Sequence, residues 1–213
     1  MPKTEEKKKM ISLLNMDCMD LMKEYSDNYF DLAIVDPPYG ININKMNMGG
    51  RQTVKPTNKK WDSKIPNKKY FNDLFRVSKN QIIWGGNYFS LPPNKCFFVW
   101  DKGEMMYGRG FAECEYAWAS FNKPADMIKI NPVQLDRIHP TQKPFKLYEW
   151  LLINYANEGD KILDTHLGSG SIAIACHNQG FDLVGCEIDK EYYDKMMIRY
   201  NNKIAQQELF HAK

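Results

Sequence analysis

The stretch KILDTHLGSGSIAIACHNQGFDLVGCE, residues 161–187, decides the fold of this chain. Its apolar runs predict a strand over residues 161–164, a helix over 171–178 and a second strand over 181–187, with a glycine turn between the first two. Another helical pattern covers residues 190–202. A strand, a helix and a further strand in this order require parallel strands covered by helices.

The rest of the chain repeats this alternation of short apolar runs with helical patterns, which is typical of the α/β class. Residues 114–121 alternate between apolar and polar side chains, and we expect them to form an antiparallel strand. The other predicted strands cover residues 11–16, 30–35, 81–86 and 96–100, and the other predicted helices cover residues 18–25, 69–78 and 145–157.

The 213 residues suit one domain, expected over residues 10–205, with flexible tails at 1–9 and 206–213. A hydrophobic share of 43% excludes a disordered chain. No apolar run reaches the roughly 20 residues that cross a bilayer, and no apolar segment of signal-peptide length lies close behind Met1, so we expect neither a membrane span nor secretion. The five cysteines are scattered, which argues against a disulfide framework or a zinc site and favours a reducing compartment.

The formal net charge of +3 is unevenly distributed. Residues 45–69 hold eight basic side chains and a single acid, Asp62, so this segment carries +7 and the remainder of the chain −4. A basic loop on a mildly acidic body indicates contact with a polyanion. The competing interpretation is an ordinary solvated, lysine-rich loop.

The segment Asp164-Thr-His-Leu-Gly-Ser-Gly-Ser171 has the composition of a cofactor-binding loop. Glycines between a strand and a helix let the backbone approach a ligand, and the helix N-terminus supplies N–H donors. Glu187 ends the next strand, where a carboxylate can accept hydrogen bonds from ribose hydroxyls. A missing third glycine and the carboxylate of Asp164 argue against a nicotinamide dinucleotide. They favour a ligand with a cationic group, such as S-adenosylmethionine.

The segment Asp36-Pro-Pro-Tyr39 directly follows the strand predicted at residues 30–35. Its prolines end the strand and fix the backbone at the carboxyl edge of the sheet. Asp36 and the carbonyl of Pro37 can each accept one N–H of a planar amino group, which frees the nitrogen lone pair for attack, while Tyr39 can stack on the ring. We expect Trp84-Gly-Gly-Asn87 to form a strand end with a close backbone approach at the same crevice.

The sequence resembles the S-adenosylmethionine-dependent amino-methyltransferases of DNA, of the permuted type in which the catalytic motif comes first. Three motifs in order carry the resemblance, namely Asp36 to Tyr39, His139-Pro-Thr-Gln-Lys-Pro144 and Asp164 to Ser171. It implies a Rossmann-like fold with a mostly parallel seven-stranded sheet, one antiparallel strand and helices on both faces. It also implies S-adenosyl-L-methionine as the cofactor.

The resemblance assigns two sets of site residues. The set that would bind the amine and stack on the base is Asp36, Pro37, Pro38 and Tyr39. The set that would bind the cofactor is Asp17, Asp36, His139, Thr141, Gln142, Lys143, Asp164, Leu167, Gly168, Ser169, Gly170, Ser171 and Glu187. Two positions depart from the family pattern, because Asn15-Met-Asp17 replaces Gly-Asp and Thr165-His166 replaces Pro-Phe. We expect His166 to fill space rather than to contact the cofactor.

The implied reaction moves a methyl group to the exocyclic N6 of an adenine flipped out of double-stranded DNA. The basic loop, residues 40–69, is expected to contact phosphates, and residues 102–138 to recognise the target. The candidate DNA contacts are Arg51, Lys55, Lys59, Lys60, Lys64 and Arg109. We also expect a cytoplasmic enzyme of a bacterial or phage-type restriction-modification system, with no metal ion or membrane contact, and either a short target or a homodimer.

Three alternatives stay open. Methylation of cytosine N4 uses the same chemistry, although its enzymes more often carry Ser-Pro-Pro where this chain has Asp36-Pro-Pro. Methylation of RNA or of a protein amide is the second, but those relatives usually place the cofactor loop first. The third is a DNA-binding relative without activity, which the complete motifs argue against. Methylation of cytosine C5 is disfavoured, because none of the eleven prolines is followed by cysteine.

Overall fold

The computed structural model of the protein describes residues 9–43 and 59–211, with side chains described up to residue 206. Strands and helices alternate along this part of the chain, as the apolar runs predict, except that three strands follow one another over residues 97–129. In chain order they are β1 (Ile11–Leu14), α1 (Cys18–Lys23), β2 (Phe30–Val35), α2 (Lys68–Val77), β3 (Ser78–Trp84), the short 3-10 helix η2 (Gly86–Tyr88), β4 (Phe97–Asp101), β5 (Cys114–Ala119), β6 (Asp126–Lys129), α3 (Phe145–Tyr155), β7 (Lys161–Asp164), α4 (Ser171–Gln179), β8 (Asp182–Cys186) and α5 (Lys190–His211).

These strands form one sheet in the order β1-β8-β7-β2-β3-β5-β4-β6. β5 is antiparallel to both of its neighbours, β3 and β4, while the other described pairs are parallel. The α/β class and the antiparallel strand expected over residues 114–121 are therefore confirmed. The expected number of strands is wrong, because the sheet has eight strands rather than seven. β6 is the one that the sequence does not predict.

β6 lacks the apolar pattern of a core strand. It is four residues long and pairs with β4 at the edge of the described sheet. Three of its residues are exposed, and Ile128 alone among the four packs against the core. The pairing of such a short edge strand depends on its partner more than on its own side chains, so the sequence carries little signal for it.

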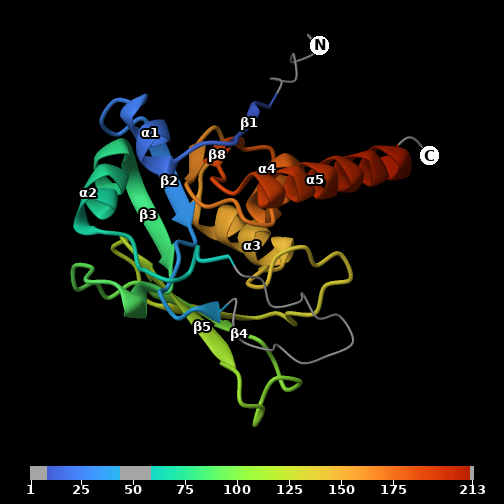
Figure 1. Ribbon diagram of the computed structural model, residues 1–213, viewed down its shortest axis with the longest axis horizontal. Helices are drawn as coiled ribbons and strands as arrows, with labels where there is room; N and C mark the ends of the chain where they lie inside the picture. The colour runs from blue at the N-terminus through green and yellow to red at the C-terminus, as the bar shows by residue number, and fades with distance from the viewer. Residues whose placement is uncertain (1–8, 44–58, 212–213) are drawn as a thin grey trace.

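Helices cover both faces of the sheet and give the molecule three layers (Figure 1). Successive residues of β2 point to opposite faces, and the two cores follow this alternation. Leu32 and Ile34 pack in the core shared with α3, α4 and α5, whereas Ala33 and Val35 pack in the core shared with α1 and α2. β2 is thus a central strand that is buried on both sides, as its continuous apolar run predicts.

Local signals explain where the elements near the site begin and end. β2 stops before Pro37 and Pro38, which have no N–H to continue the ladder. α4 lies between Gly170 and Gly180, whose φ angles are +70° and +84°. Asn67 caps α2 by accepting the N–H of Tyr70 at 3.1 Å. The chain therefore turns sharply at both motifs that the sequence singles out.

α5 is longer than predicted, since it continues to His211 instead of ending near Asn202. No glycine or proline interrupts residues 190–211, so nothing in the sequence terminates the helix at the predicted point. Although α5 is long, no helix in the described part of the chain is apolar enough over a sufficient length to cross a membrane.

Candidate active site

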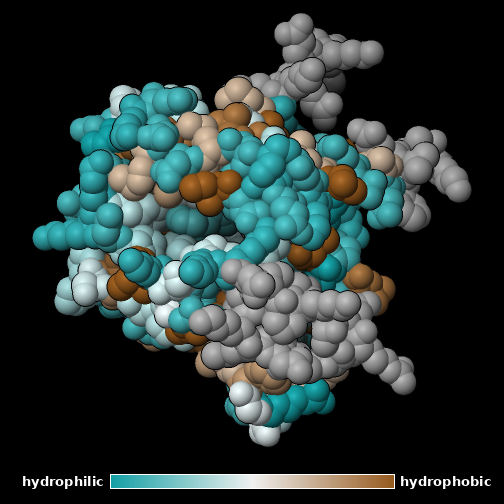
Figure 2. Space-filling view, in the orientation of Figure 1, coloured by the Kyte–Doolittle hydropathy of each residue, from teal (hydrophilic) through white to brown (hydrophobic). Residues whose placement is uncertain are grey.

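The predicted motifs meet at the carboxyl ends of neighbouring strands. Asp36 follows β2 and Asp164 ends β7, and these two strands pair in parallel. Glu187 follows β8, the next strand of the sheet, and Asp17 lies just beyond β1. The face shown in Figure 2 is hollowed near the carboxyl end of β2. The fold therefore brings residues from both ends of the chain to one edge of the sheet.

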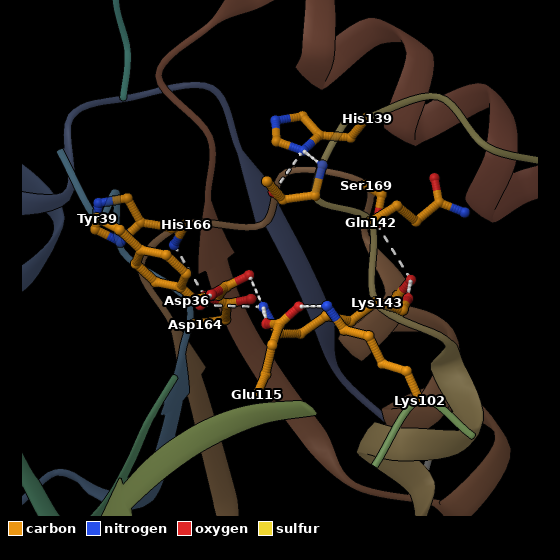
Figure 3. A network of polar contacts seen from close by, with 12 residues as sticks. Asp36, Tyr39, Lys102, Glu115, His139, Gln142, Lys143, Asp164, His166 and Ser169 are labelled. Carbon is orange, nitrogen blue, oxygen red and sulfur yellow. Dashed lines mark hydrogen bonds and ion pairs between the residues drawn. The ribbon is translucent and has the colours of Figure 1, made fainter. Parts of the chain in front are cut away.

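Asp36 is held at the end of β2 by two donors. The hydroxyl of Tyr39 donates to its Oδ1 at 2.6 Å, and the ammonium of Lys143 donates to its Oδ2 at 2.6 Å. Burial raises the pKa of Asp36, and the positive charge of Lys143 opposes this rise. Figure 3 shows the side chains of Asp36 and Asp164 next to each other, with the ring of Tyr39 beside Asp36. The tetrapeptide and the cofactor-type loop are thus in one site.

The ring of Tyr39 lies against the turn that follows β3. A Cβ built on Gly85 would stand 2.2 Å from Cε1 of Tyr39 and 2.6 Å from both Cδ1 and Cζ, the ring atoms bonded to it. These two distances are so short that the Cβ must lie over the ring face, because a position in the ring plane beyond Cε1 would be much farther from both atoms. Tyr88 of the same turn stacks on Tyr39 with centroids 4.8 Å and planes 10° apart. Glycine is therefore required at position 85, where φ is +69°.

Replacing Gly85 with alanine is expected to displace Tyr39. Gly159→Ala is the matched control, because Gly159 has φ of +85° and open space around its Cβ. In both variants an alanine in the left-handed conformation costs about 1–2 kcal/mol. A clash with the ring of Tyr39 is expected in Gly85→Ala and not in Gly159→Ala. We expect Gly85→Ala to lower the free energy of unfolding by about 2 kcal/mol more than Gly159→Ala does, as measured by urea denaturation. Equal losses in the two variants would contradict the contact.

Lys143 links two further charged residues to the tetrapeptide (Figure 3). Its Nζ lies 2.6 Å from Oδ2 of Asp36 and 3.0 Å from Oε2 of Glu115. Lys102 lies 2.8 Å from the other carboxylate oxygen of Glu115. Burial alone would raise the pKa of Glu115, but the two ammonium groups lower it to about 2. The site thus contains a network of two cations and two anions.

Sequence reasoning does not identify Glu115 and Lys102 as site residues. Both fall in the segment that it assigns to target recognition, residues 102–138. Glu115 reaches the site because β5 runs antiparallel beside β3 and β4, with Glu115 opposite Trp100. The register of β5 decides which of its side chains point toward the site. The alternating pattern in the sequence does not specify that register. A charged residue near the start of an otherwise core strand is the signal that could have suggested it.

Asp62, the single acid of the basic segment, is also missed by sequence reasoning. It is buried, and its carboxylate accepts the N–H of Gly40 at 2.8 Å and of Ile43 at 2.9 Å. Its backbone carbonyl accepts the N–H of Asn42 at 2.9 Å. Asp62 therefore fixes the residues that directly follow Tyr39.

The glycine loop joins β7 to α4 through two residues in the left-handed conformation. Gly168 has φ of +51° and Gly170 has φ of +70°. A Cβ on Gly170 would lie 2.5 Å from Cγ of Met196, so α5 packs too closely for any other residue. The hydroxyl of Ser171 donates to the carbonyl of Lys143 at 2.7 Å. The backbone of Lys143 thus contacts the loop, while its side chain contacts Asp36.

The loop is also fixed from the side of α5. Arg199 is buried and donates through Nη1 to the carbonyl of Ser169 at 2.9 Å. Its Nε donates to Asp136 at 2.8 Å, which joins the loop to the segment before His139. Ser169 is itself buried, with its hydroxyl 3.2 Å from that of Ser171. Ser169 and Ser171, both predicted to bind the cofactor, are therefore buried and form hydrogen bonds within the protein.

Asp164 is a buried carboxylate for which no ion pair occurs among the described side chains. Its Oδ1 accepts the N–H of His166 at 2.9 Å. Burial raises the pKa of Asp164 to about 8, and the negative charges of Asp36 and Glu187 add to this rise. A positively charged ligand would favour the ionised carboxylate. The site therefore fits a cationic group beside Asp164, as the sequence suggests.

Glu187 contacts the glycine loop through its carboxylate. Its Oε2 accepts the N–H of Gly168 at 2.9 Å, and its Oε1 accepts the N–H of Asp189 at 2.9 Å. Burial raises the pKa of Glu187, and these amide donors oppose the rise. Each oxygen keeps a further lone pair, so the carboxylate can still accept from ribose hydroxyls.

The segment from His139 to Pro144 packs over the glycine loop. A Cβ on Gly168 would meet the ring of His139 at 3.8 Å. That ring also packs against Trp61 and Tyr192, with centroids 5.0 Å and 4.4 Å away. Burial lowers the pKa of His139 to about 3, with a further contribution from the charge of Lys143. His139 is therefore a neutral packing residue at neutral pH.

Three other residues of the predicted cofactor set have contacts of their own within the protein. The hydroxyl of Thr141 lies 3.1 Å from Nδ1 of His139. Gln142 is buried, and its Oε1 accepts the N–H of Ile138 at 2.9 Å. Leu167 is also buried, and a Cβ on Gly185 would lie 2.6 Å from it. These residues shape the segment and the loop.

Asp17 and His166 lie near the same edge of the sheet. Asp17 caps α1, and its Oδ1 accepts the N–H of Met19 at 2.7 Å. The Nδ1 of His166 lies 2.9 Å from the hydroxyl of Thr165. Burial lowers the pKa of His166 to about 4, so the ring is neutral at physiological pH. Within the described residues, no cluster of three His, Cys, Asp or Glu side chains is arranged to hold a metal ion.

The candidate DNA contacts occupy different environments. Arg51 and Lys55 lie outside the described residues. Lys59 is directed at α5, since its ammonium lies 2.6 Å from Asp189 and 2.9 Å from Glu191. This pairing removes Lys59 from the set that we propose for phosphate contact. The candidates exposed to solvent are Lys60, Lys64 and Arg109.

The model of the DNA methylase family matches residues 94–198 of the chain. Among curated proteins, the type II methyltransferase M.BglII of Bacillus subtilis is 27% identical over 161 residues, which is 74% of this chain. The matched region is 38% of M.BglII, so the chain spans well under half the length of that relative.

Two solved structures share the fold across most of the chain. The M1.HpyAVI complex with S-adenosylmethionine (SAM) superposes with a TM-score of 0.59 at 22% identity, covering 90% of this chain and all of that one. The PvuII DNA methyltransferase, described as cytosine-N4-specific, superposes with a TM-score of 0.58 at 12% identity, covering 89% of this chain and 86% of that one. At these identities the likeness shows the fold.

Proposed function

We propose that the chain is a DNA methylase and that it methylates the exocyclic N6 of adenine in double-stranded DNA, with S-adenosylmethionine as the methyl donor. One observation carries the proposal. Asp36-Pro-Pro-Tyr39 and the loop from Asp164 to Ser171 lie at the ends of paired strands, and Lys143 contacts both. A holder for a planar amine and a site for a cationic cofactor therefore share one edge of the sheet.

The buried carboxylates support the choice of cofactor. Asp164 forms no ion pair with a described side chain although it is buried next to Asp36 and Glu187, so its environment favours an incoming positive charge. The amino group of S-adenosylmethionine would lie beside Asp164 and its ribose beside Glu187. When bound, the cofactor supplies an electrophilic methyl group on a positively charged sulfur.

The residues of the tetrapeptide act on the amine. Asp36 accepts one N–H and the carbonyl of Pro37 accepts the other, which turns the nitrogen lone pair away from the ring. Tyr39 holds the base by stacking. With the cofactor bound, the nitrogen would attack its methyl carbon in line, so that the C–N bond forms as the C–S bond breaks and S-adenosylhomocysteine leaves. The methylated amine would then release its proton to water. Positioning and electrostatic preorganisation account for catalysis in this scheme, without a covalent enzyme intermediate.

The substrate has to reach this site as a flipped nucleotide, because a base inside a duplex is inaccessible. Lys60 and Lys64, exposed in the segment between Tyr39 and α2, are proposed to contact phosphates beside the flipped base. Arg109, exposed in the connection between β4 and β5, is proposed to contact the duplex. Lys60, Lys64 and Arg109 are solvent-exposed cations of the kind that a DNA surface needs, and all three follow the tetrapeptide in sequence.

Cytosine N4 is the second candidate target, since the PvuII enzyme with the same fold is cytosine-N4-specific. The two differ in the base that fills the pocket, not in the chemistry. The presence of Asp36 where cytosine enzymes more often have serine favours adenine.

The test is to incubate genomic DNA with the purified chain and tritiated cofactor, and then to digest the DNA to nucleosides. We expect the label in N6-methyldeoxyadenosine. Label in N4-methyldeoxycytidine would select the second candidate, and label in neither would overturn the proposed function. The variant Asp36→Ala is the negative control, and it should give no label in either nucleoside because it lacks the proposed amine acceptor.

A further inference from the structure

The ammonium of Lys143 is an enclosed charge that lies between two anions. Its side chain is 2% exposed, and its Nζ lies 2.6 Å from Asp36 and 3.0 Å from Glu115. It is also 3.3 Å from the hydroxyl of Tyr39. Figure 3 shows the two carboxylates on either side of the ammonium. A buried ammonium that loses its partners is destabilised by several kcal/mol, so it must keep at least one of them.

Asp36 already has a donor on each oxygen. Tyr39 donates to Oδ1 and Lys143 to Oδ2, each at 2.6 Å. The proposed reaction needs Asp36 to accept an N–H from the target amine as well, and this amine becomes positively charged as it is methylated. Each oxygen of Asp36 keeps a further lone pair for that N–H, but an ammonium on the same carboxylate repels the developing charge. Because Tyr39 belongs to the same rigid tetrapeptide, Lys143 is the donor that can withdraw. The withdrawal requires a second anion within reach.

Glu115 meets this requirement. Its Oε2 is already 3.0 Å from Nζ of Lys143, so a small shift of the ammonium exchanges one carboxylate for the other. The ammonium groups of Lys143 and Lys102 lower the pKa of Glu115 to about 2, which keeps it ionised. Lys102 fixes its Oε1 at 2.8 Å. Lys143 can therefore move without leaving a buried charge unpaired.

We propose that Glu115 is a positioning residue that takes over the ammonium of Lys143 when the target amine binds Asp36. The inference rests on the proposed function and deepens it, because it explains how the repulsion between Lys143 and the methylated amine is relieved. Glu115 does not contact the reacting atoms. It acts through Lys143.

Two substitutions with opposite expected effects test this role. Glu115→Gln removes the alternative anion, so Lys143 stays on Asp36, and the rate of methyl transfer should fall about tenfold. Lys102→Met removes a competing cation while keeping most of the side-chain volume, so Glu115 attracts Lys143 more strongly and the rate should rise about threefold. The rate is measured in single turnover with saturating cofactor and DNA. Cofactor affinity, measured by calorimetry, should stay within about twofold of the wild type in both variants.

A merely structural role for the network predicts a different pattern. Both variants would then slow the reaction, or the loss in Glu115→Gln would be matched by weaker cofactor binding, and either result overturns the inference. Glu158→Gln, in the exposed loop before β7, is the control and should react at the wild-type rate. If Glu115→Gln does not fold, Lys102→Met decides alone, and a rate equal to or below that of the wild type overturns the inference.

The same experiment separates this inference from the proposed function. An active wild-type chain with an equally active Glu115→Gln variant overturns the role of Glu115 and leaves the methyltransferase assignment standing. A wild-type chain that methylates neither adenine nor cytosine overturns the assignment, and the role of Glu115 with it.

Discussion

Replacing Asp36 with asparagine is expected to lower the rate of methyl transfer about a thousandfold, in the range seen when a preorganised polar group is removed from a transition state. Asparagine has nearly the same shape, but it lacks the negative charge that pairs with Lys143 at 2.6 Å. Its amide N–H₂ would also face the ammonium if the side chain turned over. The amine of the substrate would then lose its acceptor, while Tyr39 and the glycine loop remain in place.

The measurement is a single-turnover assay alongside calorimetric titration of the cofactor. Affinity for the cofactor should change less than about fivefold, because Asp36 is proposed to act on the amine rather than on the donor. Asp31→Asn is the matched control, since Asp31 lies on the same strand and forms an ion pair with Lys79 away from the site. A variant Asp36→Asn that keeps a tenth of the wild-type rate would contradict the assignment of Asp36.

Binding of the cofactor is expected to strengthen steeply with rising pH and to release a proton. The pKa of Asp164 is raised to about 8 by burial, so at pH 6 to 7 the free protein holds this carboxyl mostly protonated. A cationic ligand favours the ionised form, and binding in this range must therefore expel the proton. The affinity should rise by up to about tenfold for each pH unit and level off above pH 8.

The variant Asp164→Asn isolates this effect from titration of the ligand. At pH 8 it should bind the cofactor about thirtyfold more weakly than the wild type, because a charged hydrogen-bonded pair is lost. At pH 6 the two proteins should bind almost equally, since the wild-type carboxyl is then neutral. Calorimetry in buffers of different ionisation enthalpy measures the released proton. Asp182→Asn, at the amino end of β8, is the control, and a pH dependence that survives in Asp164→Asn would contradict the role of Asp164.

Without the cofactor, the stability of the folded chain should fall as pH rises, whereas its affinity for the cofactor should increase. An aspartate whose pKa is raised on folding stays protonated in the folded state at a pH where the unfolded state has already lost the proton. The contribution of Asp164 therefore lowers stability as pH rises from about 4 toward 8. Saturating cofactor should remove this loss, because it favours the ionised carboxylate in the folded state.

The parts of the fold and the site that the sequence predicts correctly are those with local signals. The glycines around Ser169, the prolines after Asp36 and the continuous apolar runs of β2 and β7 each restrict the backbone where they stand. Because parallel strands place their carboxyl ends at one edge, Asp36 and Asp164 could be expected together although most of the chain lies between them.

The parts that the sequence does not predict depend on pairing between distant segments. β6 has too few apolar residues to be recognised alone, and it exists because β4 offers an edge. Glu115 reaches Lys143 through the antiparallel register of β5, which no periodicity specifies. Lys59 carries the same charge as Lys60, yet only the fold shows that Asp189 and Glu191, at the start of α5, lie beside it. The sequence therefore shows that Lys59 is a cation, but its ion-pair partners are known only from the tertiary structure.

The order of the strands has a consequence for how the protein is made. β1 and β2 are both complete once residue 35 has left the ribosome, yet β8 and β7 lie between them in the sheet. The nascent chain must therefore wait for residues 161–186 before either early strand gains its neighbour on that side. Until then one hydrogen-bonding edge of β2 stays open, and such an edge promotes aggregation. Chaperone dependence during synthesis should accordingly end only after residue 186 has emerged.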